Sequence, residues 1–357
     1  MLVLGIETSC DETSVSVLDG EGRVLSSIVS SQVATHRRYG GVVPEIAARA
    51  HLANFPPLLT EALGAASASL PDVGLVAATA GPGLVGALLV GLCEGKGLAF
   101  GLGVPFVPVH HIEAHCLSPF LFPEGAPSRE VPARFTALVV SGGHTHLFGF
   151  SPAGIERIGR TRDDAAGEAY DKVAKMAGLG YPGGPAVDRL ARGIAPGAPF
   201  PVPHFKDGSL DFSFAGLKTA VKERLASLGQ APLTGVPDQA GPLPDEEVPP
   251  PVKGLLAAFQ EAVVAQLEER LTRLVSAREI GLLSVSGGVA ANSLLRERLP
   301  LWGRAHGVEV LLPARALTVD NAAMVAFAGA RRHRGAAAHE GLLAPARSRW
   351  PLESLPA

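Results

Sequence analysis

The chain has 357 residues, 47% of them hydrophobic and 18% charged, and its formal net charge is −3 at pH 7. That length predicts two domains or one large one, and the hydrophobic share suffices for a buried core in each half. The balanced charge excludes an overall basic surface for nucleic acid, so a polyanion would need a local patch or a helper subunit.

Strands and helices alternate along the chain, which predicts an α/β protein. The first expected strand covers residues 3–7, ends on an acid and has no basic segment before it, so we do not expect a signal peptide. The three cysteines are too few, and odd in number, for a disulfide framework. Both observations favour a reducing, cytoplasmic location.

Two stretches show the same order of elements: a strand, a polar turn, a second strand, a hairpin turn, a third strand and then a helix. In the first stretch the elements cover residues 3–7, 8–13, 14–18, 19–22 and 24–30. In the second they cover residues 136–140, 141–145, 146–150, 151–154 and 155–160. The repetition predicts two homologous domains that face a shared cleft, with chance similarity between two ordinary meanders as the alternative.

The segment Val73–Cys93 carries no charge over about the length that spans a bilayer. The sequence Gly81-Pro82-Gly83 interrupts it, and the residues before it favour a strand over 75–79. We therefore predict a buried strand, a turn and a helix from about Leu84, and no membrane span.

Further helices and two irregular segments complete the chain. The helices are expected at about residues 44–63, 163–177, 214–228, 252–277, 291–299 and 321–332. Residues 230–251 are rich in Pro, Gly and acids, which predicts a flexible surface insert between two helices. Residues 336–357 are expected to form a disordered tail.

The segment His111-Ile112-Glu113-Ala114-His115 places two imidazoles four residues apart. In a helix they lie on one face, close enough to hold one metal ion. The zinc-protease signature H-E-x-x-H has its Glu directly after the first His, whereas Glu113 lies roughly 200° around the helix from His111. This arrangement keeps the metal pair and loses the protease base. Asp320, at the start of a predicted helix, is a candidate third ligand, or else a plain N-cap.

Glycine-rich turns follow two predicted strands, at residues 141–145 and 286–292. Backbone N–H groups in such turns can bind phosphate, because glycine lets a ligand approach, so the pair indicates a nucleotide cleft; ordinary loops are the alternative. Asp171 is a candidate ribose ligand, with a solvated helix face as the alternative. Glu12, in the first polar turn, is a candidate base if that turn faces the cleft and a simple turn residue otherwise.

Ten stretches in order resemble the universal tRNA adenosine N6-threonylcarbamoyltransferases, and the resemblance runs over about Leu2–Arg332. The stretches are Gly5–Ser14, His36–His51, Gly81–Gly83, His110–His115, Val140–Thr145, Asp163–Lys172, Tyr181–Pro185, Ser213–Ala220, Gly287–Asn292 and Asp320–Met324.

This resemblance implies an actin/Hsp70/sugar-kinase-like (ASKHA) fold, with a first domain of residues 1–115 plus about 316–335 and a second of 133–315. The implied reaction transfers the threonylcarbamoyl group of threonylcarbamoyl-AMP to N6 of adenosine 37, in tRNAs that read ANN codons, and releases AMP. His111, His115 and Asp320 are then the ligands of one divalent metal ion, with Fe²⁺ as the expected metal and Zn²⁺ as the alternative.

The resemblance also assigns substrate contacts and partners. The residues implied to line the substrate cleft are Val139, Val140, Ser141, Gly142 and Gly143. The residues implied to hold the adenylate are Asp171, Gly184 and Asn292, with Asp188 as a further ribose candidate. Cys10 and Glu12 are implied to face the reacting group, as catalytic candidates. The implied partners are tRNA, a paralogous ASKHA subunit (TsaB-like) and a small ATPase (TsaE-like). We expect tRNA to contact those partners or the arginine clusters at 36–38 and 157–162.

Three other functions are weighed against this one. A metallo-endopeptidase is disfavoured by the displaced Glu113 and by the nucleotide-type turns. An ATP-driven kinase or chaperone of the same fold would need Mg²⁺-binding acids in place of a His pair. A non-catalytic partner subunit of this fold would lack the His pair and Asp320, and all three residues are present.

Overall fold

The computed structural model describes all residues except 38, 40, 122–128, 230–242, 334–339 and 356–357. It divides into two compact units. The first unit comprises Met1–His36, Val42–Pro132 and Pro313–Ala357, and the second comprises Arg37–Gly41 and Ala133–Leu312.

The first unit is built on a five-stranded sheet with the order β3-β2-β1-β4-β5. Its strands are β1 (Leu2–Glu7), β2 (Glu12–Leu18), β3 (Val24–Ser31), β4 (Val73–Gly81) and β5 (Phe106–His110). β1, β2 and β3 form an antiparallel meander, whereas β4 pairs parallel with β1, and β5 pairs parallel with β4. The carboxyl ends of β1, β4 and β5 therefore lie at one edge of the sheet, where open α/β sheets commonly carry their sites.

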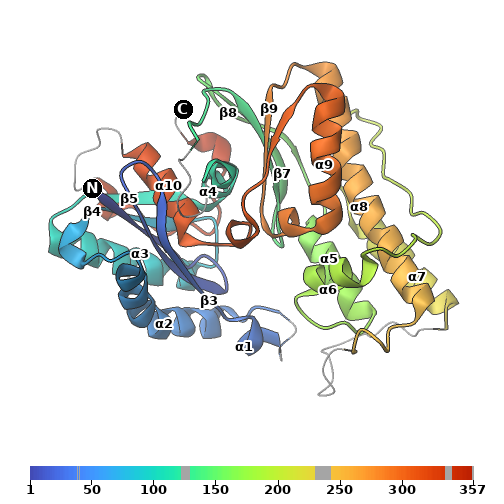
Figure 1. The fold of residues 1–357 in the computed structure, drawn as a ribbon, viewed down its shortest axis with the longest axis horizontal. Coiled ribbons are helices and arrows are strands. Elements are labelled where there is room, and N and C mark those ends of the chain that lie inside the picture. Colours follow the sequence, from blue (N-terminus) through green and yellow to red (C-terminus); the bar gives the residue numbers. More distant parts are fainter. Residues whose placement is uncertain (38, 40, 122–128, 230–242, 334–339, 356–357) are drawn as a thin grey trace. The chain divides into compact units, whose positions relative to one another are not determined.

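Helices cover both faces of this sheet. They are α1 (Val33–Arg37), α2 (Pro44–Ala65), α3 (Val85–Leu102), α4 (His111–Leu117) and α10 (Ala322–Arg332). Alternate residues of β1 point to opposite faces. Leu4 and Ile6 join the core formed with α2 and α3, whereas Gly5 faces α10. Figure 1 shows these three helices beside the strands of the first unit. A Cβ on Gly5 would lie 2.2 Å from the carbonyl oxygen of Ala322, so glycine permits the close packing of α10.

The second unit repeats this topology, with the sheet order β10-β9-β6-β7-β8. Its strands are β6 (Phe135–Val140), β7 (Thr145–Ser151), β8 (Gly154–Arg160), β9 (Leu282–Ser286) and β10 (Glu309–Leu311). Its helices are α5 (Ala166–Met176), α6 (Gly183–Ala191), α7 (Ala215–Ser227), α8 (Pro250–Ala277) and α9 (Ser293–His306). β6 pairs antiparallel with β7 and parallel with β9, as β1 does with β2 and β4. The predicted duplication is confirmed.

Short 3-10 helices connect several of these elements. They are η1 (Leu70–Asp72), η2 (Ser118–Phe120), η3 (Gly288–Ala291), η4 (Arg315–Leu317), η5 (Glu340–Leu343) and η6 (Leu352–Ser354).

The uncharged segment from Val73 folds as β4, a Gly-Pro-Gly turn and α3, which confirms the predicted strand, turn and helix. By length and composition alone, α3 is the single helix among the described residues that could cross a membrane. Its Gly91 and Gly95 pack closely against Thr8 and Phe106 of the first unit, so one face of α3 belongs to that unit's core.

The prediction of a disordered tail is wrong for the residues that the structure describes, and the described part of the expected flexible insert is partly packed. Residues 340–355 of the expected tail pack on the first unit: Leu352 is only 2% exposed, and the Arg347 amide donates to the Ala80 carbonyl at 2.8 Å. Residues 243–249 of the expected insert pack on the second unit, where Val248 is buried and Asp245 pairs with Arg189 through two hydrogen bonds. The rest of that insert, 230–242, lies outside the described residues.

The packing of α10 on β1 generates a stability prediction. A Gly5→Val substitution should lower the free energy of unfolding by about 3 kcal/mol, because its side chain overlaps the α10 backbone. A Gly97→Ala substitution is the matched control, since a Cβ there meets nothing within 4 Å, and it should raise stability by up to about 1 kcal/mol through helix propensity. Urea unfolding followed by circular dichroism measures both; equal stability of the two variants would contradict the packing argument.

Candidate metal centre

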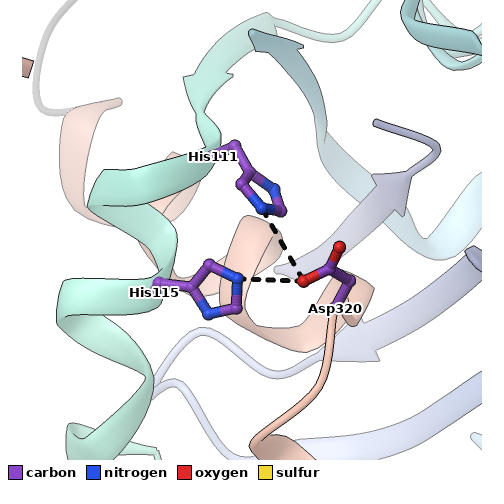
Figure 2. Close-up of side chains that lie close together, drawn as sticks. All are labelled: His111, His115 and Asp320. Atoms are coloured by element: carbon purple, nitrogen blue, oxygen red, sulfur yellow. Dashed lines mark hydrogen bonds and ion pairs between the residues drawn. The ribbon is translucent and has the colours of Figure 1, made fainter. Parts of the chain in front are cut away.

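Two histidines and one aspartate converge at the carboxyl edge of the first sheet. α4 begins directly after β5, so His111 and His115 project from one face of it toward Asp320, which lies just before α10 (Figure 2). The Nε2 atoms of His115 and His111 lie 3.0 and 3.7 Å from the same Asp320 oxygen. Atoms bound to one ion at ~2 Å lie roughly 3.3 Å apart, so these separations suit a shared metal.

The three side chains fit a divalent metal by their chemistry as well as by their geometry. Their ligand atoms all lie within 4.8 Å of one another, and the two imidazole rings stand edge to face. Both histidines are buried, and Asp320 is partly exposed. Two imidazoles and one carboxylate leave coordination positions open for a substrate. The group can therefore hold a metal and still bind a ligand.

Glu7, at the end of β1, orients the first histidine. Its fully buried Oε2 lies 3.1 Å from Nδ1 of His111, and it also accepts a 2.6 Å hydrogen bond from the Thr79 hydroxyl. The Ser9 hydroxyl lies 3.2 Å from the same Nδ1. Because Nδ1–H donates to the carboxylate, Nε2 is the ring atom that faces Asp320 and that can bind a metal once it has lost its proton.

Burial, the two carboxylates and the imidazole together determine the protonation states of His111 and Glu7. Burial opposes a charge on His111, but Asp320 and Glu7 outweigh it and raise the pKa of His111 to about 9. Burial likewise acts against ionised Glu7, yet the facing His111 lowers the pKa of Glu7 overall. In the metal-free protein at neutral pH the pair is therefore an imidazolium and a carboxylate.

A third histidine, His110, is the N-cap of α4. Its Nδ1 accepts hydrogen bonds from the backbone N–H groups of Ile112 and Glu113, at 3.1 and 3.4 Å. Its Nε2 lies 2.8 Å from the carbonyl oxygen of Trp350, to which it donates. Burial lowers the pKa of His110 to about 3, so the ring is neutral and this tautomer is fixed.

Asn321 sets the position of the third ligand. Its buried Oδ1 accepts from the N–H of Met324 at 3.0 Å and so caps α10. Its Nδ2 donates to the Val319 carbonyl at 2.7 Å, and this bond fixes the backbone on both sides of Asp320. Asp320 is therefore not the N-cap of the helix, and its carboxylate is directed toward the histidines (Figure 2).

Glu113 is directed away from the metal ligands, as its spacing predicts. Its carboxylate accepts a 2.5 Å hydrogen bond from Nε of Arg332 on α10. Burial raises the pKa of Glu113, and Arg332 partly opposes that effect. Glu113 thus joins two helices, and it does not serve as a base beside the metal.

The two catalytic candidates of the first turn differ in what they can do. Burial, followed by Asp11 and Asp320, raises the pKa of Cys10, so its thiol stays protonated and is a poor nucleophile. Burial and then the charges of Asp320 and Asp11 raise the pKa of Glu12 to about 9. Glu12 also accepts a 3.1 Å hydrogen bond from Ser31. It is a protonated carboxylic acid in the metal-free protein at neutral pH.

The predicted substrate turn of the second unit lies at the carboxyl end of β6. The side chains of Val139 and Val140 are fully buried, so only their backbone is available to a ligand. Gly142 and Gly143 are exposed, and a Cβ on either would meet nothing within 4 Å. Ser141 holds the turn together, since its amide and hydroxyl bond to the backbone of His144.

Two of the predicted adenylate residues, Asp171 on α5 and Gly184 on α6, lie close to the start of α6. Oδ1 of Asp171 accepts a 2.7 Å hydrogen bond from the N–H of Gly183, which fixes the turn before Gly184. Gly184 itself is half-buried and has open space where a Cβ would point. The structure thus places Asp171 beside this glycine turn.

The other two adenylate candidates meet at the start of α9. Asp188 accepts from the amide and hydroxyl of Ser293, at 2.9 and 2.5 Å. Asn292 caps α9 through Leu295 and donates to Gln260 at 2.8 Å. Both side chains are buried in these bonds. A cavity of about 160 Å³ adjoins them, lined in part by Arg192, Ile194, Gln260, Ser293 and Glu297.

Glu7 and His110 are the site residues that sequence reasoning missed. An acid at the end of an otherwise apolar strand was the available signal for Glu7, because a buried carboxylate needs a partner. His110 carried no such signal, since its partner Trp350 lies in a segment expected to be disordered.

Comparison with known proteins agrees with this geometry. The family model of the tRNA N6-adenosine threonylcarbamoyltransferases matches residues 23–327. The transferase of that name from Thermodesulfovibrio yellowstonii is 48% identical over 334 residues, which cover 92% of this chain and 93% of that protein. The one from Ralstonia pickettii is 47% identical over 362 residues, which cover 99% of each chain.

Solved structures with little sequence identity share the fold. Component A of the (R)-2-hydroxyglutaryl-CoA dehydratase of Acidaminococcus fermentans has a TM-score of 0.52 at 13% identity, over 94% of this chain and 100% of that one. HypF of T. kodakarensis has a TM-score of 0.57 at 13% identity, over 96% of this chain and 49% of that one. Together with the repeated sheet topology, these likenesses establish the ASKHA-type fold.

Metal affinity should depend on pH. Because the pKa of His111 is about 9 without metal, a proton must leave it for each ion bound at lower pH. The affinity for Zn²⁺ should therefore rise about tenfold per unit between pH 6 and 8. Competition with a chromophoric chelator at each pH measures it, and proton release can be checked by calorimetry in two buffers. An affinity that does not change with pH would contradict the protonated state of His111.

The orienting role of Glu7 is testable with a near-isosteric change. Glu7→Gln should weaken metal binding by about tenfold or more, because the His111 ring loses its charged acceptor. The matched control is Glu113→Gln, another buried acid of the same unit, which should leave the affinity unchanged because Glu113 faces Arg332. Equal losses in both variants would mean a general structural effect and would reject the assignment.

Proposed function

The chain belongs to the family of tRNA N6-adenosine threonylcarbamoyltransferases, and we propose that His111, His115 and Asp320 form the centre at which it holds the threonylcarbamoyl group. The enzyme transfers that group to N6 of an adenosine in tRNA, which forms t6A. The observation that supports the location is the convergence of three metal-ligating side chains at the carboxyl edge of the first sheet.

The proposed donor is threonylcarbamoyl-AMP, and the proposed acceptor is adenosine 37 of tRNAs that read ANN codons. The exocyclic adenine amine is a weak nucleophile, so the reaction needs a good leaving group. N6 attacks the carbamoyl carbon, the bond from that carbon to the phosphate oxygen breaks, and AMP leaves. The proton lost from N6 must be taken up by a nearby group.

A bound divalent ion would supply Lewis-acid stabilisation of the threonylcarbamoyl oxygens. We propose Fe²⁺, because two histidines and one carboxylate are the ligand set of many non-haem iron sites, with Zn²⁺ as the alternative. The neighbouring residues of the chain orient the metal ligands. Glu7 fixes the tautomer of His111, and Asn321 holds the backbone on either side of Asp320.

We assign the proton transfer to Glu12 and no nucleophilic role to Cys10. The pKa of Glu12 is raised by burial and by nearby acids, so a cation that neutralises Asp320 would lower it toward neutrality. A carboxyl group with a pKa near the working pH is suited to accept and release a proton. The protonated thiol of Cys10 has no comparable reactivity.

For the adenylate, we propose the carboxyl edge of the second sheet. The exposed turn at Gly142 and Gly143 leaves backbone N–H groups accessible to a phosphate. We propose that the ribose contacts Asp171 on α5 and the turn at Gly184, which Asp171 holds through the amide of Gly183. Asp188 and Asn292 are proposed to contact the adenylate while they keep their hydrogen bonds to Ser293 and Gln260. Ser293 and Gln260 line the adjoining cavity.

The tRNA contacts and the partners are also proposals. His36 is buried, and Arg162 forms ion pairs with Asp207 and Asp211. Arg37, Arg157 and Arg160 are exposed, and we propose these three arginines as the tRNA contacts. We further propose a cytoplasmic location. We also propose two partners, a paralogous ASKHA subunit (TsaB-like) and a small ATPase (TsaE-like), because a chain with a net charge of −3 would benefit from partner subunits in binding the polyanion tRNA.

The assignment is tested with threonylcarbamoyl-AMP, unmodified tRNA and the partner subunits, with nucleosides read by mass spectrometry. His111→Ala and Asp320→Ala should each lower the rate of t6A formation by at least about a hundredfold, since each removes a metal ligand. Glu113→Gln should keep most of the activity. Full activity in both ligand variants would reject the metal centre, whereas no product from the wild type would reject the proposed donor.

A further inference from the structure

The residues 340–355, here called the C-terminal strap, run along the first unit and are fastened at several points. The Lys96 ammonium donates to the Ala344 carbonyl at 2.5 Å, and the Arg347 amide donates to the Ala80 carbonyl at 2.8 Å. Leu352 is buried, and Trp350 packs against the core of the first unit. The strap is therefore an integral part of this unit.

Two glycines let the strap approach the sheet closely. A Cβ on Gly341 would lie 1.9 Å from the carbonyl oxygen of Phe106 on β5. A Cβ on Gly81, at the end of β4, would lie 2.1 Å from the carbonyl oxygen of Arg347. The strap thus touches the two strands whose carboxyl ends lead toward the metal ligands.

At Trp350 the strap contacts His110, the residue before the first metal ligand. The Trp350 carbonyl accepts the Nε2–H of His110 at 2.8 Å, and the two rings lie 4.8 Å apart. The Arg347 guanidinium lies over the Trp350 ring at 4.8 Å. The other ring nitrogen of His110 accepts the first free N–H groups of α4. One imidazole therefore joins the strap to the start of the helix that carries both histidine ligands.

We propose that the C-terminal strap positions the metal site: Trp350 fixes the ring of His110, and His110 fixes the start of α4 and so the directions of His111 and His115. His110 is a positioning residue in this proposal, since it acts through α4. The proposal rests on the metal centre proposed above, but it does not depend on the transfer reaction, and its test needs no tRNA.

The expected effect follows from the precision that metal ligands require. α4 has only seven residues, and the N–H groups of Ile112 and Glu113 in its first turn, which have no partner within the helix, bond to His110. A ligand displaced by about 0.5 Å no longer meets the ion at a favourable distance. Loss of hydrogen bonds behind metal ligands typically weakens binding by about 10–100-fold.

The test uses the full-length protein with Co²⁺, whose visible spectrum reports the ligand geometry, and with Zn²⁺ in competition with a chelator. His110→Phe keeps a ring and removes both hydrogen bonds, and Gly341→Val displaces the strap from β5. Both should weaken metal binding by about tenfold or more and change the Co²⁺ spectrum. Leu343→Ala is the matched control, because Leu343 lies in the strap but is 89% exposed, and it should change neither.

A conservative variant separates the two bonds of His110. Asn caps helices well but is too short to replace the bond to the Trp350 carbonyl. His110→Asn should therefore bind metal more tightly than His110→Phe and more weakly than the wild type. Wild-type affinity in His110→Asn, or wild-type affinity and spectrum in folded His110→Phe and Gly341→Val, would overturn the proposal.

A measurement on the unmodified protein covers the case in which a variant fails to fold. Coupling between two sites is reciprocal, so if the strap favours metal binding, metal binding must stabilise the strap. Hydrogen exchange of the Arg347 amide, which is bonded to Ala80, should slow when Zn²⁺ is added. Unchanged exchange with bound Zn²⁺ would overturn the proposal, whereas a wild type that binds no metal would reject the metal centre itself.

Discussion

The candidate site depends on one buried pair, the carboxylate of Glu7 and the imidazole of His111. A carboxylate with no exposure is stable inside a protein only if its oxygens are paired. Thr79 and His111 bond to Oε2 of Glu7, and the Ser9 amide donates to its Oε1. These groups come from the ends of β1, β4 and β5, which are parallel neighbours. The register of the sheet therefore brings the pair together, and the pair in turn directs His111 toward Asp320.

Sequence reasoning found the residues whose geometry is local. A spacing of four residues suffices to place two histidines on one helical face, and the same rule directed Glu113 away to Arg332. The duplicated order of strands was also predictable, because each meander is continuous in sequence. Glu7 was missed because its partner lies 104 residues away, across a sheet whose register no local pattern specifies.

The errors have a common physical origin. The tail and the insert are rich in Pro, Gly and charged residues, so their composition indicated disorder in the tail and flexibility in the insert. The described residues of both are held by hydrogen bonds to backbone groups and to a few side chains. The strap is held through the carbonyls of Ala80 and Trp350, and Asp245 by one arginine. Backbone bonds of this kind leave no signature in composition. Residue type alone also does not reveal that Asp188 and Asn292 bond to protein groups, and their contact with the adenylate stays a prediction.

The two units share a topology but differ at equivalent strand ends. Glu7 ends β1 and Val140 ends β6, and both pair with the first part of the next strand in the same hairpin arrangement. The buried carboxylate of Glu7 requires a hydrogen-bond partner, and His111 is that partner. Val140 instead packs in the apolar core of the second unit. The turns that follow differ accordingly, with Ser9 buried beside His111 and Gly142 exposed. At equivalent strand ends, the first unit therefore has a buried acid that holds a histidine, whereas the second has a buried valine followed by an exposed glycine turn.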